Sequence, residues 1–349
     1  MISKGIAILA LFFIENIKCI IMAKYIIDYR FLKEGDIILI NENERLAKMM
    51  GSEFDHVMYF AGGVTCIEAD GLAVKANQCD RFIFSDPRKC MILRLRNNQE
   101  VEKISMITTW IRSRSGMEYS TEEARLVQTA RNGKHKQDRT FCTRLVTQAF
   151  HLHGIDLVEN PDYCTPQEIV ESEELIKVSD CLFEAPEDTN MQSSPALESQ
   201  RDIFLMYHQE ASKIFNCDIQ TEDDIIKALI EQPLFDNMLV NCVKKSEFDT
   251  LIQQALSEDD SLLNKSTFLD RFAKDVQLSI LNERIYFSTL KINDLETQIT
   301  NYQNLYNCYK LNYFKYWIDI YSQVLEITIN MQQMAFELLF SITTCYRKG

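Results

Sequence analysis

Glycine and proline are distributed very unevenly along this chain of 349 residues. Nine of the ten glycines lie at or before Gly154, and the tenth is the last residue. Between Leu234 and Lys348 there is neither glycine nor proline. Because these two residues mark turns and interrupt regular elements, we expect a mixed α and β part followed by an almost entirely helical part.

The stretch between the two parts, EAPEDTNMQSSPALES at 184–199, is polar and acidic and contains two prolines. That composition is typical of a linker. We therefore predict an α+β fold class in which an antiparallel sheet packs on helices and a helical bundle or coiled coil follows. The expected segments are an apolar N-terminal helix at 1–29, an α and β domain at 30–180, a linker at 181–198 and an all-helical domain at 199–349.

Charge and cysteine usage exclude several kinds of function. The net charge of −14 argues against a nucleic-acid-binding protein, since phosphate binding needs a basic face. None of the eleven cysteines forms a C-x-x-C pair, so zinc ribbons and redox dithiols have no support. Neither a cluster at metal-ligand spacing nor a phosphate-binding glycine loop occurs. We expect no metal and no cofactor, and the scattered cysteines favour a reducing, cytoplasmic compartment.

The N-terminus allows other locations. It carries a ten-residue apolar run, Gly5–Ile14, which is too short to span a bilayer. Glu15, Asn16 and Lys18 then interrupt it, and no A-x-A-like cleavage site follows. A packed or membrane-associating helix is favoured over a cleaved signal, which makes residues 5–22 a candidate membrane contact. A secreted effector also stays open as an alternative.

Short β-branched and aromatic runs predict strands in the first part. They are DIILI at 36–40, HVMYF at 56–60, VTCIEA at 64–69, LAVKA at 72–76 and MILRL at 91–95. Helical spacing from Val101 to Ile111 predicts a first helix, and Ser120 with Glu123 predicts the start of a second. A third is expected from about Cys142 to His153. TPQE at 165–168 carries the signals of a fourth helix start.

The helical part has a long apolar stripe with residues spaced by three and four. Such a stripe is typical of a coiled coil or a long helical hairpin. Its many aromatic residues favour packing inside one chain, although a dimer seam or a groove for a partner helix remains an alternative. The stripe consists of Ile292, Leu295, Ile299, Tyr302, Tyr306, Tyr309, Tyr313, Trp317, Ile320, Val324, Ile327, Met331, Met334 and Leu338.

A cysteine nucleophile needs a nearby base, and the chain has five histidines. His151 and His153 share a helix with Cys142 but lie too far round or along it to reach the thiol. His208 belongs to the helical part, and His135 stands in the basic loop RNGKHKQDR at 131–139. His56 remains, near the start of a predicted strand.

The second predicted strand of that hairpin contains Glu68, twelve positions after His56. If Ala61, Gly62 and Gly63 form a three-residue loop, His56 lies directly opposite Glu68. Directly opposed residues share one face of a sheet with Cβ atoms about 5 Å apart, so Glu68 would orient the His56 ring. A two-residue Gly-Gly turn would instead place the two on opposite faces.

Cys142 has the setting of a reactive thiol. With Thr140 as N-cap it lies in the first turn of a helix, where free N–H groups and the helix dipole favour a thiolate. The N–H of Cys142 itself is a candidate donor to an oxyanion. Additional positive potential is expected from nearby basic residues, which are Lys134, Lys136, Arg139 and Arg144.

The order of His, an acidic residue twelve positions later, and a Cys opening a helix resembles the circularly permuted papain-like cysteine hydrolases. These form the permuted branch of the NlpC-type superfamily and include YiiX-like proteins. Lecithin:retinol acyltransferase-like enzymes share the order. The matching stretches, at about 30–178, are LKEGDIILI, FDHVMYFAGGVTCIEADGLAVKA, FCTRLVTQAFHLHGIDL and YCTPQEIVES.

The resemblance implies Cys142 as nucleophile, His56 as base and Glu68 as the orienting residue. It implies a thiol hydrolase, a cysteine peptidase or amidase acting on a peptide or cell-wall-like amide through an acyl-enzyme. A lipid acyltransferase or deacylase acting on a lipid ester is the alternative. A third reading is a non-catalytic module in which the helical domain binds a partner or forms an oligomer.

Overall fold

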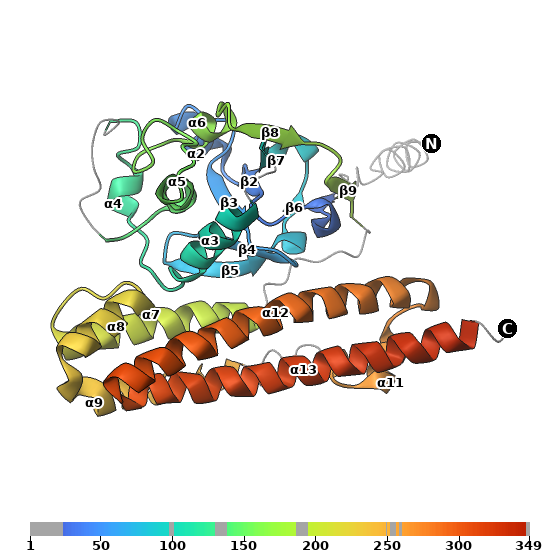
Figure 1. Cartoon of the computed structure of the whole chain (residues 1–349). Coiled ribbons are helices and arrows are strands. Elements are labelled where there is room, and N and C mark those ends of the chain that lie inside the picture. The colour runs from blue at the N-terminus through green and yellow to red at the C-terminus, as the bar shows by residue number, and fades with distance from the viewer. Residues whose placement is uncertain are drawn as a thin grey trace, which may run out of the picture.

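The structure is a computed structural model that describes residues 24–97, 101–129, 138–185, 195–248, 250–251, 256–257 and 260–346. The described chain is α+β: antiparallel sheets with short helices form the first part, and long helices form the second. Figure 1 shows the β-rich part lying along one side of the elongated helical part. We call them the sheet part, residues 24–185, and the helical part, residues 195–346.

A six-stranded antiparallel sheet organises the sheet part, in the order β5-β4-β3-β2-β7-β8. A smaller sheet has the order β6-β1-β9. All five predicted strands are confirmed, and β5 extends two residues beyond its predicted end. The strands are β1 (Tyr25–Ile27), β2 (Ile37–Ile40), β3 (His56–Phe60), β4 (Thr65–Ala69), β5 (Val74–Gln78), β6 (Ile83–Phe84), β7 (Cys90–Leu95), β8 (Leu175–Val178) and β9 (Leu182–Glu184).

Both faces of the large sheet are covered, and for this reason β2 is buried at all four positions. One face, with Val57 and Tyr59, packs against helices α3 and α5. The other face, with Met58, packs against the smaller sheet. Each such aliphatic or aromatic side chain contributes about 1.5–3 kcal/mol when fully buried. The helices are α2 (Glu44–Met49), α3 (Val101–Arg112), α4 (Thr121–Ala124), α5 (Cys142–Leu152) and α6 (Pro166–Val170).

The helix predicted at 1–29 is wrong in the part of it that the structure describes. Residues 1–23 lie outside the described residues, but residues 25–27 form strand β1 where a helix was expected to continue to 29. A 3₁₀ helix, Tyr29–Phe31, follows. Further 3₁₀ helices are Cys79–Arg81, Pro87–Lys89, Pro233–Phe235 and Asp260–Leu262. Strand β1 exists because the smaller sheet pairs it on both sides, a long-range contact that short-range patterns do not reveal.

The linker is shorter than predicted. Strand β9 occupies 182–184, and helix α7 begins at Pro195, inside the stretch expected to be linker. Residues 186–194 lie outside the described residues. Proline is well suited to the first turn of a helix, since the N–H that it lacks would have no helical partner there.

The helical part is dominated by an antiparallel hairpin of two long helices, α12 and α13. Its turn is at Lys310, which has a positive φ of 57°. The apolar stripe therefore belongs to two helices, and the hairpin among the predicted alternatives is the one observed. Gln332 donates to Thr289 across the pair at 2.7 Å. The helices of this part are α7 (Pro195–Phe215), α8 (Glu222–Glu231), α9 (Asp236–Lys245), α11 (Lys265–Arg271), α12 (Lys274–Tyr309) and α13 (Asn312–Tyr346).

Candidate active site

His56 and Glu68 are in contact, with 2.6 Å between His56 Nε2 and Glu68 Oε2. The prediction that His56 lies directly opposite Glu68 is wrong, because the residue opposite Glu68 on β3 is Met58. His56 therefore lies diagonal to Glu68 on the same face of the sheet. Diagonal neighbours in antiparallel strands remain within reach of long side chains. The two side chains meet as expected, but through a different register.

The register follows from the position of the β3–β4 loop. Ala61 N donates to Thr65 O and Thr65 N donates to Gly62 O, so the loop consists of Gly62, Gly63 and Val64. Both glycines have positive φ, 92° and 65°. The loop lies one position further along the chain than predicted, which shifts the pairing by two residues. An even shift leaves each side chain on its face, since side chains alternate with a period of two.

Two further residues hold Glu68, and neither was among the predicted site residues. Asn77 Nδ2 donates to Glu68 Oε1 at 2.9 Å, and Lys75 Nζ lies 3.8 Å from the same oxygen. Both stand on β5, where Lys75 is the direct partner of Glu68. The polar alternation of Lys75 and Asn77 was a usable signal, but the predicted strand ended before Asn77.

Burial alone raises the pKa of the Glu68 carboxyl, which is 5% exposed. The hydrogen bond and charge of His56 oppose this effect, with help from Asn77 and Lys75, and the pKa of Glu68 stands below its ordinary value. Glu68 is therefore a buried carboxylate with partners for both oxygens. That arrangement fixes its orientation toward the imidazole.

Cys142 is the first residue of α5 and is 8% exposed. The expected N-cap, Thr140, is wrong: Phe141 is the N-cap, and it makes no side-chain hydrogen bond to the described first turn. The Thr140 hydroxyl donates to Phe141 O instead. The backbone N–H groups of the first turn therefore have no side-chain cap, and Cys142 lies at the positive end of the helix dipole.

Cys142 acts on the His56 ring through hydrogen bonding and charge. Burial alone lowers the pKa of His56, but hydrogen bonds and charge interactions with Cys142 and Glu68 raise it well above the ordinary value. His56 is consequently held between a sulfur atom and a carboxylate. Since Nε2 contacts Glu68, Nδ1 is the ring nitrogen left for Cys142.

The expected basic neighbourhood of Cys142 is largely neutralised. Arg144 is 1% exposed and binds Glu123 at 2.6 Å. Its guanidinium also lies over the rings of Phe141 and Tyr163, at 4.4 and 4.8 Å from their centres. Arg144 thus anchors the start of α5 in the core and does not face solvent.

Arg139, the other predicted cation that the structure describes, adds little free charge at the site. Arg139 is bound to Glu118 at 2.7 Å and to Asp218 at 3.2 Å. Lys134 and Lys136 lie outside the described residues. Among the described residues, an uncapped helix N-terminus and the charged form of His56 are the favourable influences on a Cys142 thiolate.

The described histidines other than His56 lie elsewhere. His151 pairs with Asp156 at 2.5 Å, and His153 Nδ1 lies 2.7 Å from Ala149 O. His208 is buried at the boundary between the two parts, and neither ring nitrogen has a hydrogen-bond partner. Burial lowers the pKa of His208 to about 4, so it is neutral at pH 7. His135 lies outside the described residues.

Other thiols in the sheet part are less suited to reaction. Burial raises the pKa of Cys66, Cys79 and Cys90 in the core between the two sheets. Every cysteine whose side chain the structure describes is a free thiol. Within the described ranges no three His, Cys, Asp or Glu side chains gather to hold a metal ion.

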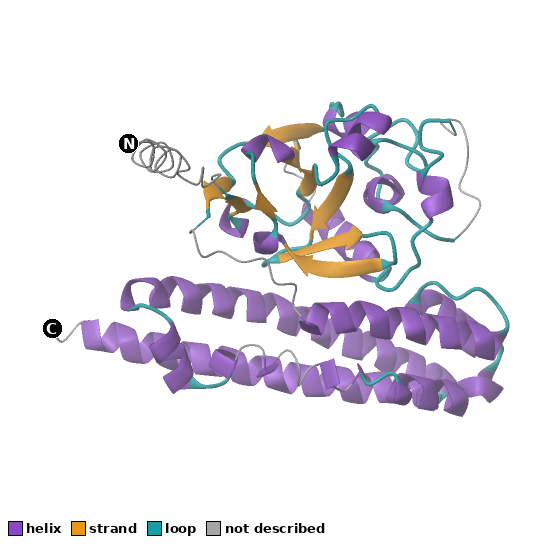
Figure 2. Ribbon diagram, turned by 180° about the vertical axis from the view of Figure 1, so that it is seen from behind, coloured by secondary structure: helices purple, strands orange, loops and turns teal. Residues whose placement is uncertain are grey.

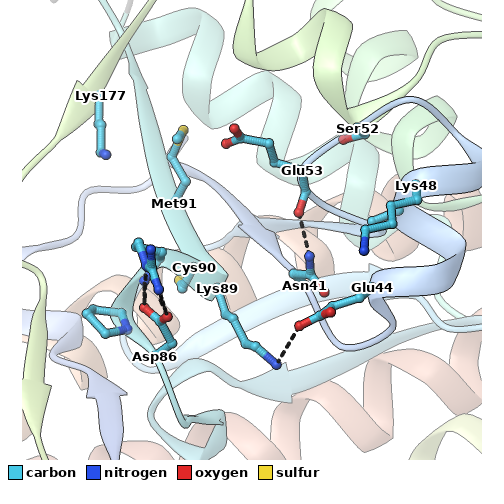
Figure 3. Close-up of a pocket in the computed structure, with 13 residues that line it drawn as sticks. Asn41, Glu44, Lys48, Ser52, Glu53, Asp86, Lys89, Cys90, Met91 and Lys177 are labelled. Atoms are coloured by element: carbon cyan, nitrogen blue, oxygen red, sulfur yellow. Dashed lines mark hydrogen bonds and ion pairs between the residues drawn. The ribbon is translucent and has the colours of Figure 1, made fainter.

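A cavity of about 760 Å³ opens between α2 and the start of β7 (Figure 3). Nine of its thirteen lining residues are charged or polar, and Lys89 lies 3.7 Å from Glu44. Ile40 pairs with His56 on one side and with Cys90, in the cavity wall, on the other. The cavity therefore lies at the same end of the sheet as His56, about 10 Å away at ordinary strand spacing.

Within the described residues, no helix is both long enough and apolar enough to cross a membrane. No family model, curated protein or solved structure matches this chain. The site is therefore interpreted from its own geometry and chemistry.

Proposed function

We propose that this protein is a thiol hydrolase that cleaves an amide bond, in a peptide or cell-wall-like substrate, through an acyl-enzyme on Cys142. The observation that carries the proposal is the 2.6 Å contact between His56 Nε2 and the buried Glu68 carboxylate, together with the effect of Cys142 on the pKa of His56. A base held by a buried acid and facing a thiol at a helix N-terminus is the arrangement that cysteine nucleophiles require. The proposed fold of the sheet part is the permuted papain-like one.

The proposed reaction has two steps. His56 Nδ1 takes the thiol proton, Cys142 Sγ bonds to the amide carbon, and the resulting oxyanion accepts a hydrogen bond from the Cys142 backbone N–H. Collapse of this intermediate breaks the C–N bond, and His56 returns the proton to the leaving amine. Water then attacks the thioester with His56 as base, which releases the acid and restores the thiol. Glu68 keeps Nε2–H oriented throughout.

A peptide amide is the proposed substrate because the order of His56, Glu68 and Cys142 resembles that of the NlpC-type hydrolases. Lipid ester chemistry uses the same nucleophile, and the substrate test below separates the two.

Labelling with iodoacetamide tests the nucleophile. Exposure alone predicts that the exposed Cys217 and Cys308 react faster than the buried Cys142. If His56 activates Cys142, Cys142 reacts faster than Cys217 and Cys308 at neutral pH. In His56→Ala this activation is lost, and the two exposed cysteines react faster again. Mass spectrometry of each cysteine peptide gives the rates. Faster reaction of Cys217 than of Cys142 in the wild-type chain would contradict the proposal.

The substrate class is tested with fluorogenic peptide amides and lipid esters, and with the mass of the adduct trapped on Cys142. Peptide amides are expected to turn over in the wild-type chain and to be inert with Cys142→Ala. Cys217→Ala is the matched control, because it removes an exposed thiol outside the site. An acyl-enzyme formed with the lipid esters alone would move the assignment to lipid deacylation.

A further inference from the structure

The helical part packs along the β5 edge of the large sheet, where α7 contacts the strand that holds Lys75 and Asn77. Figures 1 and 2 show α7 and α12 beneath this edge from opposite sides. Contacts across the boundary approach the candidate active site from two directions. One set ends at Glu68, and the other ends at the segment that precedes Cys142.

Alternating charges lead from α7 to Glu68. Arg201 binds its neighbour Asp202 at 2.6 Å through Nη2, and its Nη1 lies 3.6 Å from Asp70. Asp70 binds Lys75 at 2.7 Å. Lys75 in turn lies 3.8 Å from Glu68 Oε1. The side chains of Arg201, Asp70, Lys75 and Glu68 are each at most 18% exposed. The chain of charges is therefore mostly shielded from water, where such interactions are stronger than at the surface.

The second set of contacts holds the segments that lead into α5. Gln220 accepts from Glu118 N at 3.0 Å, and Gln209 donates to the Glu118 carboxylate at 3.2 Å. Arg139 joins this carboxylate to Asp218 of the helical part. Glu118 O accepts from Thr140 N, two residues before Cys142. The helical part thus contacts both sides of the site.

We propose that Arg201 is a positioning residue of the candidate active site, through which the helical part places Lys75 and so fixes the Glu68 carboxylate against His56. This inference rests on the proposed function. Lys75 is shared between two carboxylates and lies closer to Asp70. Arg201 supplies Asp70 with a second cation. Without Arg201, Asp70 draws Lys75 away from Glu68, and the carboxylate loses part of its support on the Oε1 side.

Several other ionisable groups face the His56–Glu68 pair. Glu42 lies on the loop after β2, and Asp55 directly precedes β3. The Glu42 carboxyl interacts with the charges of His56, Glu68 and Asp55. Tyr119 lies beside Cys142 and Asp70, and burial together with their charges raises its pKa. The surroundings are thus mainly acidic, so the loss of one cation raises the pKa values of both Glu68 and His56. This shift gives Arg201 a signature that a merely structural contact lacks.

The experiment measures the rate of Cys142 labelling by iodoacetamide in the full chain from about pH 4 to about pH 10, which brackets ordinary carboxyl and thiol pKa values. Arg201→Gln is expected to shift both the acidic and the alkaline limb of the pH–rate profile to higher pH, by about half a pH unit to one pH unit. Lys75→Gln moves them further, because Lys75 is nearer to Glu68. Arg201→Lys keeps the charge and is expected to restore the wild-type profile.

Two controls separate positioning from docking. Lys213→Gln removes a cation from the same helix, where Lys213 pairs with the exposed Glu210, and is expected to leave the profile unchanged. Gln220→Ala removes a docking contact without changing charge, so it lowers the thermal unfolding temperature without moving the limbs. Thermal unfolding of every variant shows that it is folded at the assay temperature.

A wild-type profile in Arg201→Gln, beside a shifted one in Lys75→Gln, overturns the inference. So does an Arg201→Gln variant that only loses stability, as Gln220→Ala does. Both results leave the proposed function intact, provided that Cys142 of the wild-type chain shows activated labelling. Absence of activated labelling in the wild-type chain is the separate failure of the proposed function itself.

Discussion

Glu68 reaches His56 diagonally across the β3–β4 hairpin, with 2.6 Å between Oε2 and Nε2, while its direct partner in the register is Met58. The carboxylate raises the pKa of His56 and so favours the imidazolium form beside the thiol. The stability that this interaction contributes is present below the unfolded pKa of His56, and it is lost as pH rises through the higher folded pKa. Glu68 therefore affects both the reaction and the pH dependence of folding.

Glu68→Gln is expected to lower kcat/KM by about 10²- to 10⁴-fold, by comparison with the loss of the orienting acid in other triads. Because the negative charge is gone, the pKa of His56 falls, and the alkaline limb of the activity profile moves to lower pH. Steady-state kinetics against pH with the peptide amide substrate measures both effects. An unchanged alkaline limb would show that Glu68 does not act on His56.

Asn77 provides a graded test of how Glu68 is held. Asn77→Ala removes one hydrogen bond of about 1 kcal/mol and is expected to lower kcat by about 5- to 10-fold. Asn77→Asp places a second carboxylate against Glu68, so we expect a larger loss that recovers partly at lower pH, where one of the two is protonated. Single-turnover kinetics of both variants measures the effect. Equal activity of the two variants at all pH values contradicts this role.

The buried Arg144–Glu123 pair is expected to control the stability of the α5 start. Arg144→Met leaves Glu123 buried without its cation and should lower the free energy of unfolding by about 3–5 kcal/mol. The double variant Glu123→Gln with Arg144→Met should lose less. Urea denaturation gives the values, and Arg88→Met, at a pair whose arginine is 89% exposed, is the control, for which we expect almost no loss. A double variant whose loss of unfolding free energy equals the sum of the losses from the two single substitutions would show that Arg144 and Glu123 are not coupled.

Glu222 in the helical part is expected to make stability fall as pH rises. Burial raises its pKa to about 7, and it accepts hydrogen bonds from Tyr302 and Tyr313. Because the folded pKa is higher than the unfolded one, native Glu222 keeps its proton longer, and stability declines from about pH 4.5 to about pH 7. The decline amounts to about 3 kcal/mol.

Glu222→Gln removes the ionisation and should flatten this part of the curve, so that the variant is the more stable protein at about pH 8. Urea denaturation across the pH range measures the difference. The exposed Glu337, changed to Gln, serves as the control. A Glu222→Gln variant whose stability has the same slope as that of the wild type would refute the assignment.

Local patterns predicted the elements that carry the site, because each depends on neighbours in sequence. Short β-branched and aromatic runs led to β3 and β4, helical spacing led to α3, and Gly154 indicated where α5 ends. Thr165 with Glu168 forms the expected capping box at α6. Such signals concern backbone hydrogen bonds within a few residues, which the sequence encodes directly.

The errors concern features that depend on contacts distant in sequence. Thr140 gave way to Phe141 as N-cap because Thr140 pairs with the segment at Glu118 and Tyr119. Arg144, expected to add charge near the thiol, instead lies between two rings and binds Glu123. In each case a tertiary contact outweighed a reasonable local preference.

The sequence by itself determined that His56 and Glu68 stand on neighbouring strands of one hairpin and which cysteine opens a helix, while the three-residue loop seen in the structure decided that the two share a face. Side-chain alternation has a period of two, so His56 and Glu68 share a face in the observed register as in the predicted one. Only the tertiary structure decided how the site is held: Asn77 and Lys75 come from β5, and Arg201 comes from a helix more than a hundred residues later. Those partners meet because sheet pairing and helix docking bring distant residues together, a result that no local pattern contains.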